Sequence, residues 1–391
     1  MSKIDELIAK FCPEGVRFET LDKVSRVSVG TRPTDQDLVQ GGPAPYFNGG
    51  VRSNGSVPVP NTSGDTVVIP SRGSVGVVGY SPLDFWCGPL SYRLFSKDAS
   101  IMETRYLYFF LKSIQREVIS LQQSGSIPAL NKAQLIKIRV PVPPLEVQRE
   151  IVSILDKFTQ LEAELEAELE ARRSQFTFFV DQIFDLDGPH GAPVEKLEGI
   201  CRITRASGLE KAQLQADGLP VVQYGEIHMH YDTVATSSRS FADQSVAAKL
   251  QTANPGDLVL VTTSEDVKDV GNPLVWMGTT PIGVGGESLI IKHDLDPIYL
   301  GMFFRSNSFY SQKLPFVNGS KVKRISAASL NKICIPVPPL PVQKKLGESL
   351  LALENLVNSA GDGLPAEITA RRKQYEYYRN QLLTLKELET A

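Results

Sequence analysis

Arginine and asparagine side chains in glycine-rich turns are the residues of this chain with the most recognisable binding chemistry. Arginine can pair bidentately with guanine and asparagine with adenine, while most loop contacts to DNA go to phosphates. The segments are GTRPT (30–34), NGGVRSNG (48–55), PSRGS (70–74), TRASG (204–208), TTSEDVK (262–268) and NGSKVKR (318–324). The candidate DNA contacts are Thr31, Arg32, Arg52, Asn54, Ser71, Arg72, Ser74, Arg205, Thr263, Ser264, Lys268, Asn318, Ser320, Lys321, Lys323 and Arg324. For any single residue, a phosphate contact or a solvated loop competes with base reading.

Motifs for catalysis or for metal binding are missing from the sequence. It has no Gly-x-Gly-x-x-Gly after a strand, no Gly-Lys-[Ser/Thr] and no Asn-Pro-Pro-[Tyr/Phe]. GSVGVVG from Gly73 has the wrong spacing for a phosphate loop and predicts a hairpin or bulge. His228 and His230 would share a face of a strand without a third metal ligand, and SEDVK (264–268) is too short to indicate a nuclease. We expect no catalytic residue, no metal and no cofactor.

Length and composition favour a folded protein of two or more domains. The chain has 391 residues, 42% of them hydrophobic, and no apolar run near the ~20 residues of a membrane span. MSKIDELIAKF at the start lacks a secretory signal, so we expect a cytoplasmic protein without membrane contact. The four cysteines are far apart and are expected to be buried thiols.

Charge is segregated along the chain. The formal net charge is −3, which argues against a surface that binds nucleic acid everywhere. Residues 161–170 nevertheless hold five glutamates and no base, while 311–332 hold five bases and no acid. The cluster of Lys321, Lys323 and Arg324 is the strongest electrostatic candidate for a phosphate contact.

An internal repeat decides the predicted architecture. LIKIRVPVPPLEVQ from Leu135 returns as LNKICIPVPPLPVQ from Leu330, with ten of fourteen positions identical at an offset of 195. ARRSQF (171–176) returns as ARRKQY (370–375), YLYFFLKS (106–113) resembles YLGMFFRS (299–306), and LDKVSRV (21–27) weakly resembles LEGICRI (197–203). We therefore predict two related domains with approximate two-fold symmetry.

Each repeat has strands first, then a Pro-Val-Pro-Pro stop, then a long helix. DTVVIP, GVVGY, GDLVLVTT and ESLIIK are typical of strands, and the prolines fix an extended entry before a helix at Leu-x-Val-Gln. The second helix is interrupted by SAGDGLP (359–365). The predicted fold is α+β: two strand-rich domains separated by a pair of long antiparallel coiled-coil helices.

Apolar residues in the two helices recur at spacings of three and four, which predicts a coiled-coil seam. Its predicted members, which also include candidate partner contacts, are Val147, Ile151, Ile154, Phe158, Leu161, Leu165, Leu169, Phe176, Phe179, Val342, Leu346, Leu353, Ile368, Tyr375, Tyr378 and Leu382. The outer faces of Phe178, Phe179, Tyr377 and Tyr378 are expected to be exposed and to bind another helix.

LEAELEAELEA (161–171) repeats a four-residue unit within the first helix. Four residues lengthen a helix by ~6 Å and turn its end by a net ~40°, and one base pair of DNA turns by roughly 34 to 36°. The unit is therefore a candidate ruler for the distance between two half-sites, and an exposed helix of good helix formers is the alternative.

The duplicated Pro-Val-Pro-Pro-Leu-x-x-Gln, with helices that carry Ala-Arg-Arg-x-Gln-[Phe/Tyr], resembles the specificity subunit of Type I restriction-modification enzymes. The resemblance implies a non-catalytic, sequence-specific DNA-binding subunit that reads a bipartite double-stranded site. Its implied partners are two methyltransferase (M) subunits that methylate adenine N6, with restriction (R) subunits as further partners.

On this resemblance the first target recognition domain spans 1–144 and the first spacer helix 145–186. The second recognition domain spans 187–339 and the second spacer helix 340–391. A coiled-coil scaffold that holds two protein partners is the alternative, and a self-contained nuclease or methyltransferase is a third, poorly supported one.

Overall fold

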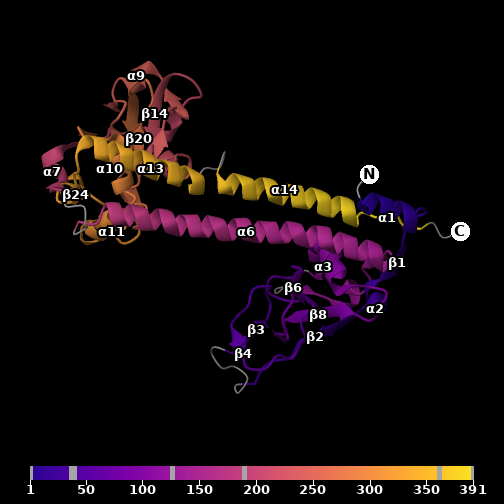
Figure 1. Cartoon of the computed structure of the whole chain (residues 1–391). Helices are drawn as coiled ribbons and strands as arrows, with labels where there is room; N and C mark the ends of the chain where they lie inside the picture. The colour runs from indigo at the N-terminus through magenta and orange to yellow at the C-terminus, as the bar shows by residue number, and fades with distance from the viewer. Residues whose placement is uncertain (1–2, 35–41, 124–127, 187–191, 359–362, 389–391) are drawn as a thin grey trace. The chain divides into compact units, whose positions relative to one another are not determined.

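The computed structural model describes residues 3–34, 42–123, 128–186, 192–358 and 363–388. The chain divides into two compact units (Figure 1). Unit 1 comprises Met1–Glu164 with Ala370–Ala391, and unit 2 comprises Leu165–Thr369. The division falls inside the two long helices that span 145–183 and 364–383, so each unit consists of a strand-rich domain and parts of these helices.

Unit 1 is built on an antiparallel sheet of order β2-β8-β5-β6, and a second sheet has the order β4-β3-β7. Along β8, Tyr92 and Leu94 point toward helix α3, where Tyr106 and Phe109 join them in one buried cluster. Figure 1 shows α3 between the long helix α6 (Leu145–Ile183) and this sheet. The elements are α1 (Lys3–Phe11), β1 (Arg17–Thr20), α2 (Leu21–Val24), β2 (Ser25–Val29), β3 (Ala44–Phe47), β4 (Ser56–Val57), β5 (Thr66–Pro70), β6 (Gly79–Ser81), β7 (Trp86–Cys87), β8 (Ser91–Ser96), α3 (Thr104–Ser113), α4 (Gln115–Ser120), β9 (Gln122–Gln123), β10 (Ala129–Leu130), α5 (Lys132–Leu135) and β11 (Arg139–Val142).

Unit 2 has a five-stranded sheet of order β13-β22-β18-β20-β15 and a four-stranded sheet of order β16-β14-β21-β17. Helix α10 packs on the first of these sheets and on the helix α13 (Leu340–Asn358). The elements are β12 (Val194–Lys196), α7 (Leu197–Ile200), β13 (Cys201–Arg205), η1 (Lys211–Gln213), β14 (Leu219–Gln223), α8 (Tyr224–Met229), β15 (Val234–Ala235), β16 (Ser240–Ala242), α9 (Gln244–Ala247), β17 (Gln251–Ala253), β18 (Leu258–Val261), β19 (Thr263–Ser264), β20 (Pro273–Trp276), β21 (Ile282–Gly285), β22 (Ser288–His293), α10 (Pro297–Phe303), α11 (Asn307–Lys313), η2 (Leu314–Phe316), β23 (Lys323–Arg324), α12 (Ala327–Leu330) and β24 (Cys334–Pro336).

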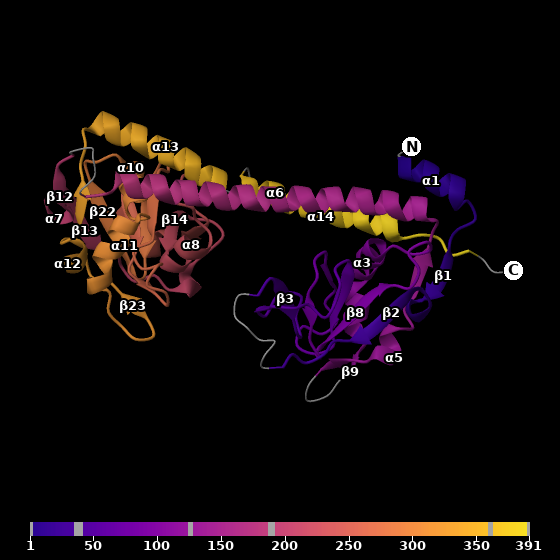
Figure 2. The ribbon, with the colours of Figure 1, turned by 60° about the horizontal axis from the view of Figure 1, so that its bottom comes forward.

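The internal repeat recurs as a repeated topology. The strand pair β1–β11 corresponds to β12–β24, and both pairs are antiparallel. The weakly similar segments at Leu21 and Leu197 both form a four-residue helix followed by a sheet-edge strand, α2–β2 and α7–β13. Figure 2 shows α7 beside β13. The sequence repeat therefore extends to the edge strand of each main sheet.

The long helices begin where the proline stops predict. Helix α6 spans Leu145–Ile183 and α13 spans Leu340–Asn358, each directly after Pro-Val-Pro-Pro. Helix α14 spans Leu364–Leu383 and starts before the predicted end of the interruption at Pro365. Proline fits there because the N–H groups of the first helical turn need no intrahelical acceptor.

Within unit 1, α6 and α14 run antiparallel. The ring of Phe158 lies 5.5 Å from that of Tyr378 and 6.3 Å from that of Tyr375, between centroids. Farther along α6, Glu162 pairs with Arg372 at 2.5 Å, so residue numbers rise on one helix as they fall on the other. This supports the prediction that the two helices pack on each other.

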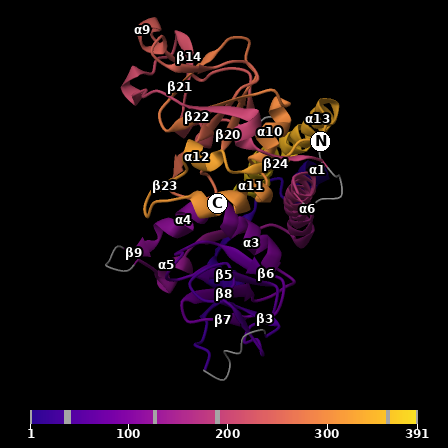
Figure 3. The ribbon, with the colours of Figure 1, turned by 90° about the vertical axis from the view of Figure 1, so that its left-hand side faces the viewer.

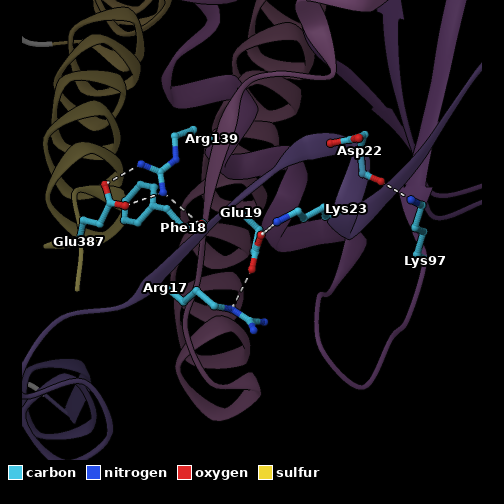
Figure 4. A network of polar contacts seen from close by, with 8 residues as sticks. All are labelled: Arg17, Phe18, Glu19, Asp22, Lys23, Lys97, Arg139 and Glu387. Atoms are coloured by element: carbon cyan, nitrogen blue, oxygen red, sulfur yellow. Dashed lines mark hydrogen bonds and ion pairs between the residues drawn. The ribbon is translucent and has the colours of Figure 1, made fainter. Parts of the chain in front are cut away.

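The C-terminal segment that follows α14 is tied to the strands of unit 1. Arg139 on β11 pairs with Glu387 at 2.5 Å and donates to the Phe18 carbonyl on β1 at 3.2 Å (Figure 4). The backbone of Val16 also exchanges hydrogen bonds with Lys386 and Leu388. Residues 386–388 near the C-terminus therefore bond to Val16, which precedes β1, and to Arg139 on β11, so they contact both the start and the end of the first repeat.

Burial along the helices departs from a simple seam. Leu155, Val180 and Phe184 lie outside the predicted seam and are buried, because each packs into the core of a strand-rich domain. Among predicted members, Val147, Ile151, Ile368 and Leu382 are buried; Ile154, Phe158, Leu165, Leu169, Phe176, Leu346, Leu353 and Tyr375 are half-buried; Leu161, Phe179, Val342 and Tyr378 are exposed. A helix that packs against both a domain and another helix buries apolar residues on two of its faces. A seven-residue spacing pattern describes one such face and does not distinguish it from the other.

Candidate nucleic-acid interface

In unit 1, two of the predicted loops lie against each other. The Ser74 N–H donates to the Gly49 carbonyl at 2.9 Å, and Ser71 N–H donates to the Leu90 carbonyl at 2.8 Å. Gly73 has a φ of +79°, and a Cβ there would lie 2.4 Å from the Gly49 oxygen, so the close approach requires glycine. The backbone thus holds the 48–55 and 70–74 segments together. Their candidates Arg52, Asn54, Arg72 and Ser74 are exposed, and Ser71 is half-buried.

Thr31 and Arg32 reach the same region from the end of β2. The Thr31 N–H donates to the Cys87 carbonyl at 2.9 Å, and Asn61 Nδ2 donates to Thr31 Oγ1 at 2.9 Å. Burial raises the pKa of the Tyr46 hydroxyl, and the positive charge of Arg32 opposes that rise. Because Tyr46 lies on β3, which leads into the 48–55 loop, Arg32 is close to that loop.

In unit 2, residues more than fifty positions apart form one small two-stranded sheet. On β19 and β23, Thr263 lies opposite Arg324 and Ser264 opposite Lys323. Asn318 and Arg324 exchange backbone hydrogen bonds of 2.9 and 2.8 Å, which closes the basic turn. Arg205, Lys268, Asn318, Ser320, Lys321 and Arg324 are exposed, and Ser264 and Lys323 are half-buried. Thr263 is buried, so its side chain is not available to a ligand in this conformation.

Arg205 joins this surface at the end of β13. Its guanidinium lies 3.7 Å from the Glu287 carboxylate, and the Glu287 carbonyl accepts from the N–H of Thr262 at 2.9 Å. The loop also contains acidic groups, since Asp266 accepts from the Lys268 N–H at 2.9 Å. The excess of positive charge therefore lies in the 318–324 turn rather than in the 262–268 segment.

Unit 1 also has a groove with four basic and two acidic lining residues, none of which is among the DNA contacts predicted from the sequence. It has a volume of about 910 Å³, and its lining includes Arg26, Arg93, Lys97 and Lys132. Arg93 donates to Ser28 Oγ at 3.0 Å and to Thr62 Oγ1 at 2.8 Å, so its guanidinium is fixed. Lys97 donates to the Asp22 carbonyl (Figure 4). The alternation of SYRLFS, with Tyr92 and Leu94 inward and Arg93 outward, was the available signal.

The histidine pair lies on a helix and not on the predicted strand. His228 is in α8 and His230 is its C-cap, because Gln223 and Glu226 form a capping box that starts a helix there. In the described ranges, no group of three His, Cys, Asp or Glu side chains is placed to hold a metal ion. GSVGVVG joins β5 to β6 as a hairpin connection, as predicted.

The cysteines differ in burial. Cys12 and Cys87 are buried as predicted, whereas Cys201 and Cys334 are only half-buried, since they lie on edge strands. Burial raises the pKa of the Cys87 thiol to about 11 and that of Cys201 to about 12, so these two groups are protonated at neutral pH. Among the helices of the described residues, none is long and apolar enough to cross a membrane.

Comparison with known proteins gives a consistent family. Residues 13–171 match the family model of the type I restriction modification DNA specificity domain. A putative type I restriction enzyme specificity subunit from Haemophilus influenzae is 26% identical over 382 residues, which cover 94% of this chain and 95% of the relative. The EcoR124I/EcoR124II specificity subunit from Escherichia coli is 27% identical over 311 residues, 73% of this chain and 72% of that relative.

Solved structures agree at the level of the fold. The type I restriction-modification S subunit from M. genitalium has 17% sequence identity and a TM-score of 0.63, and the match covers 94% of this chain and 96% of that one. A chain from a structure of type I R-M complex assembly and conformational transition has 16% identity and a TM-score of 0.60, covering 95% and 98%. Over nearly its whole length the chain is therefore similar to specificity subunits of type I restriction-modification systems, and residues 13–171 carry the match to their DNA specificity domain.

Proposed function

We propose that this specificity subunit reads a bipartite site on double-stranded DNA, with one half-site for the strand-rich domain of each unit. The observation that carries the proposal is the repeated topology with polar, basic loops in corresponding places. The β5–β6 connection holds Arg72, and the β18–β20 connection holds Lys268. Two similar reading surfaces in one chain suit a target made of two short sequences.

The partners of this function are two methyltransferase subunits, which supply adenine-N6 methylation, and restriction subunits that join them. The specificity chain contributes recognition and no catalytic group. Phe178 on α6 and Tyr377 on α14, in corresponding positions of the two repeats, are each 59% exposed. Large aromatic side chains on an exposed helix are typical of binding surfaces, so we assign them to the docking of methyltransferase subunits.

The LEAELEAELEA segment sets the length of the unread spacer between the half-sites. It lies within the continuous helix α6, which passes from unit 1 into unit 2. One added or removed four-residue unit changes the rotation at the helix end by a net ~40°, close to the turn of one base pair. Its glutamates repel phosphate, which keeps the segment itself away from DNA.

The test is a genome-wide map of N6-methyladenine in the source organism with the gene intact, deleted and restored by a plasmid copy. We expect one split motif, two short half-sites around a spacer of fixed length, to disappear on deletion and to return on complementation. Retention of every methylated motif in a deletion strain that expresses a partner methyltransferase subunit would contradict the proposal. Purification of this chain with proteins that bind in a salt-insensitive way, without any DNA binding, would instead indicate a scaffold.

A further inference from the structure

We propose that Lys112 and Lys313 are positioning residues that hold the DNA-reading loops of the two units in shape. The loops are the β5–β6 loop (71–78) and the β18–β20 loop (262–272). This inference rests on the proposed function and deepens it, because it separates side chains that face DNA from side chains that fix the loop beneath them. Neither lysine is among the DNA contacts predicted from the sequence.

The two loops correspond in topology. The main sheet of unit 1 has the order β2-β8-β5-β6, and that of unit 2 begins β13-β22-β18-β20. Each loop joins the third of these strands to the fourth, and both connections are antiparallel. The loops also carry candidate DNA contacts: Ser71, Arg72 and Ser74 in the first, and Thr263, Ser264 and Lys268 in the second.

In unit 1, the side chains that bond to the loop come from the end of α3 and the start of α4. Lys112 Nζ donates to the Val78 carbonyl at 3.1 Å and to Gln115 Oε1 at 2.9 Å. The same Gln115 oxygen accepts from the Val78 N–H at 2.9 Å. Both polar backbone groups at the last residue of the β5–β6 loop are therefore bonded to helix side chains. Figure 3 shows α3 beside β5 and β6.

In unit 2, the lysine that bonds to the loop comes from α11. Lys313 is 2% exposed, and its Nζ donates to the Lys268 carbonyl at 2.9 Å and also to the Val270 carbonyl. Arg305, which occupies the position of Lys112 in the YLGMFFRS repeat, donates to Asn272 Oδ1 at 3.2 Å. Asn272 is the last residue of its loop, as Val78 is in unit 1. Lys112 and Arg305, which correspond in the repeat, thus each donate a hydrogen bond to the last residue of their loop.

A glycine with positive φ packs each loop directly on the second helix. Gly76 has a φ of +73°, and a Cβ there would lie 2.9 Å from the Ile119 Cα on α4. Gly271 has a φ of +86°, and a Cβ there would lie 2.7 Å from the Phe309 ring on α11. At these glycines the loop backbone is already in contact with the helix. The lysine hydrogen bonds therefore add to a close packing of loop on helix.

A buried lysine suits this task because one ammonium has three donors and can satisfy several inward carbonyls. Its desolvation is unfavourable, and burial lowers the pKa of Lys313 to about 8 while Asp269 and Asp266 oppose the shift. The free energy lost when the ammonium is buried is offset by its hydrogen bonds to the loop backbone. With the carbonyls of residues 268 and 270 turned toward Lys313, the exposed Lys268 side chain remains available to a ligand.

The experiment uses the full chain assembled with its methyltransferase subunits. Lys313→Met and Lys112→Met keep the length of the side chain and remove its donors. Methylation is measured on a library of duplexes in which each half-site is randomised in turn. We expect Lys313→Met to reduce discrimination at one half-site by about fivefold or more, the scale of one base contact, with the other half-site unchanged. Lys112→Met should give the mirror result.

Matched controls are Lys332→Met in unit 2 and Lys23→Met in unit 1, because both lysines are exposed. Lys313→Gln retains an amide donor and should recover part of the discrimination. Should Lys313→Met fail to assemble, Gly271→Ala displaces the same loop through the Phe309 ring and should relax the same half-site. The unaffected half-site reports on folding within each variant.

Equal loss at both half-sites would show a general structural role and overturn the inference, as would full discrimination in both lysine variants. These results are distinct from failure of the proposed function. In that case the unaltered complex would show no split motif on the library, before any variant is compared.

Discussion

Gln148 and Gln343, 195 positions apart, make two corresponding hydrogen bonds in the two units. Gln148 Oε1 accepts from the Glu103 N–H at 2.9 Å, and Gln343 Oε1 accepts from the Asp296 N–H at 3.0 Å. Their amide nitrogens donate to the carbonyls of Pro143 at 2.8 Å and Pro338 at 2.7 Å. Each glutamine is buried and joins its proline stop to the N-cap residue of a domain helix, α3 or α10, so each long helix leaves its domain in a fixed direction.

Replacement of Gln343 by leucine should destabilise unit 2 by about 1–3 kcal/mol in the free energy of unfolding, because buried donors and acceptors lose their partners. Hydrogen exchange measured by mass spectrometry should show faster exchange at the Asp296 amide and unchanged exchange at Glu103, and Gln148→Leu should show the reverse. Gln160→Leu is the control, since Gln160 is exposed and donates to Glu164 on the same helix. Equal protection in all three variants would contradict the prediction.

Substitution of single exposed aromatic residues should remove methyltransferase subunits one at a time. We expect Phe178→Ser and Tyr377→Ser each to weaken the binding of one subunit by tenfold or more, at the scale of an interface hot spot of about 2 kcal/mol. Native mass spectrometry should then show complexes with one methyltransferase subunit in place of two. Ser174→Ala, also exposed on α6, is the control. Full occupancy in both aromatic variants would exclude these residues as docking contacts.

Deletion of residues 162–165 should shorten the recognised spacer by one base pair. Because the segment is repetitive, the shortened helix still places a glutamate directly after Leu161, where Glu162 pairs with Arg372. The readout is the methylated motif found by sequencing. A variant with residues 166–169 replaced by four alanines keeps the length and should keep the spacer. An unchanged motif in the deletion variant would refute the role of the segment as a ruler.

The exposed Lys321 should contact a phosphate and not a base. Lys321→Ala is expected to weaken DNA binding to a similar degree on specific and unrelated duplexes, and to reduce the slope of log K against log salt by about 1. Fluorescence anisotropy over a range of salt concentrations measures both quantities. Lys332→Ala provides the comparison at an exposed lysine outside the 318–324 turn. A loss confined to the specific duplex would identify Lys321 as a base contact instead.

The repeat and its punctuation were predictable from the sequence alone. Prolines cannot continue a helix, and a duplicated Pro-Val-Pro-Pro with glutamine four residues on determines where α6 and α13 begin, whatever surrounds them. The apolar, β-branched runs likewise predicted β5, β18 and β22, whereas only the last two residues of the predicted strand GVVGY lie in β6. The exposure of Phe178 and Tyr377 was also predicted, and it is confirmed.

Only the tertiary structure decided which helix residues are buried and which loops meet. Leu155 and Val180 lie off the seven-residue seam, yet they are buried against domain cores that the periodicity of the helix does not represent. The pairing of Thr263 with Arg324 joins residues 61 positions apart, and Thr263, one of the predicted DNA contacts, is buried there. Lys313 looks like any basic residue in the sequence, because its role depends on carbonyls that another part of the chain turns toward it.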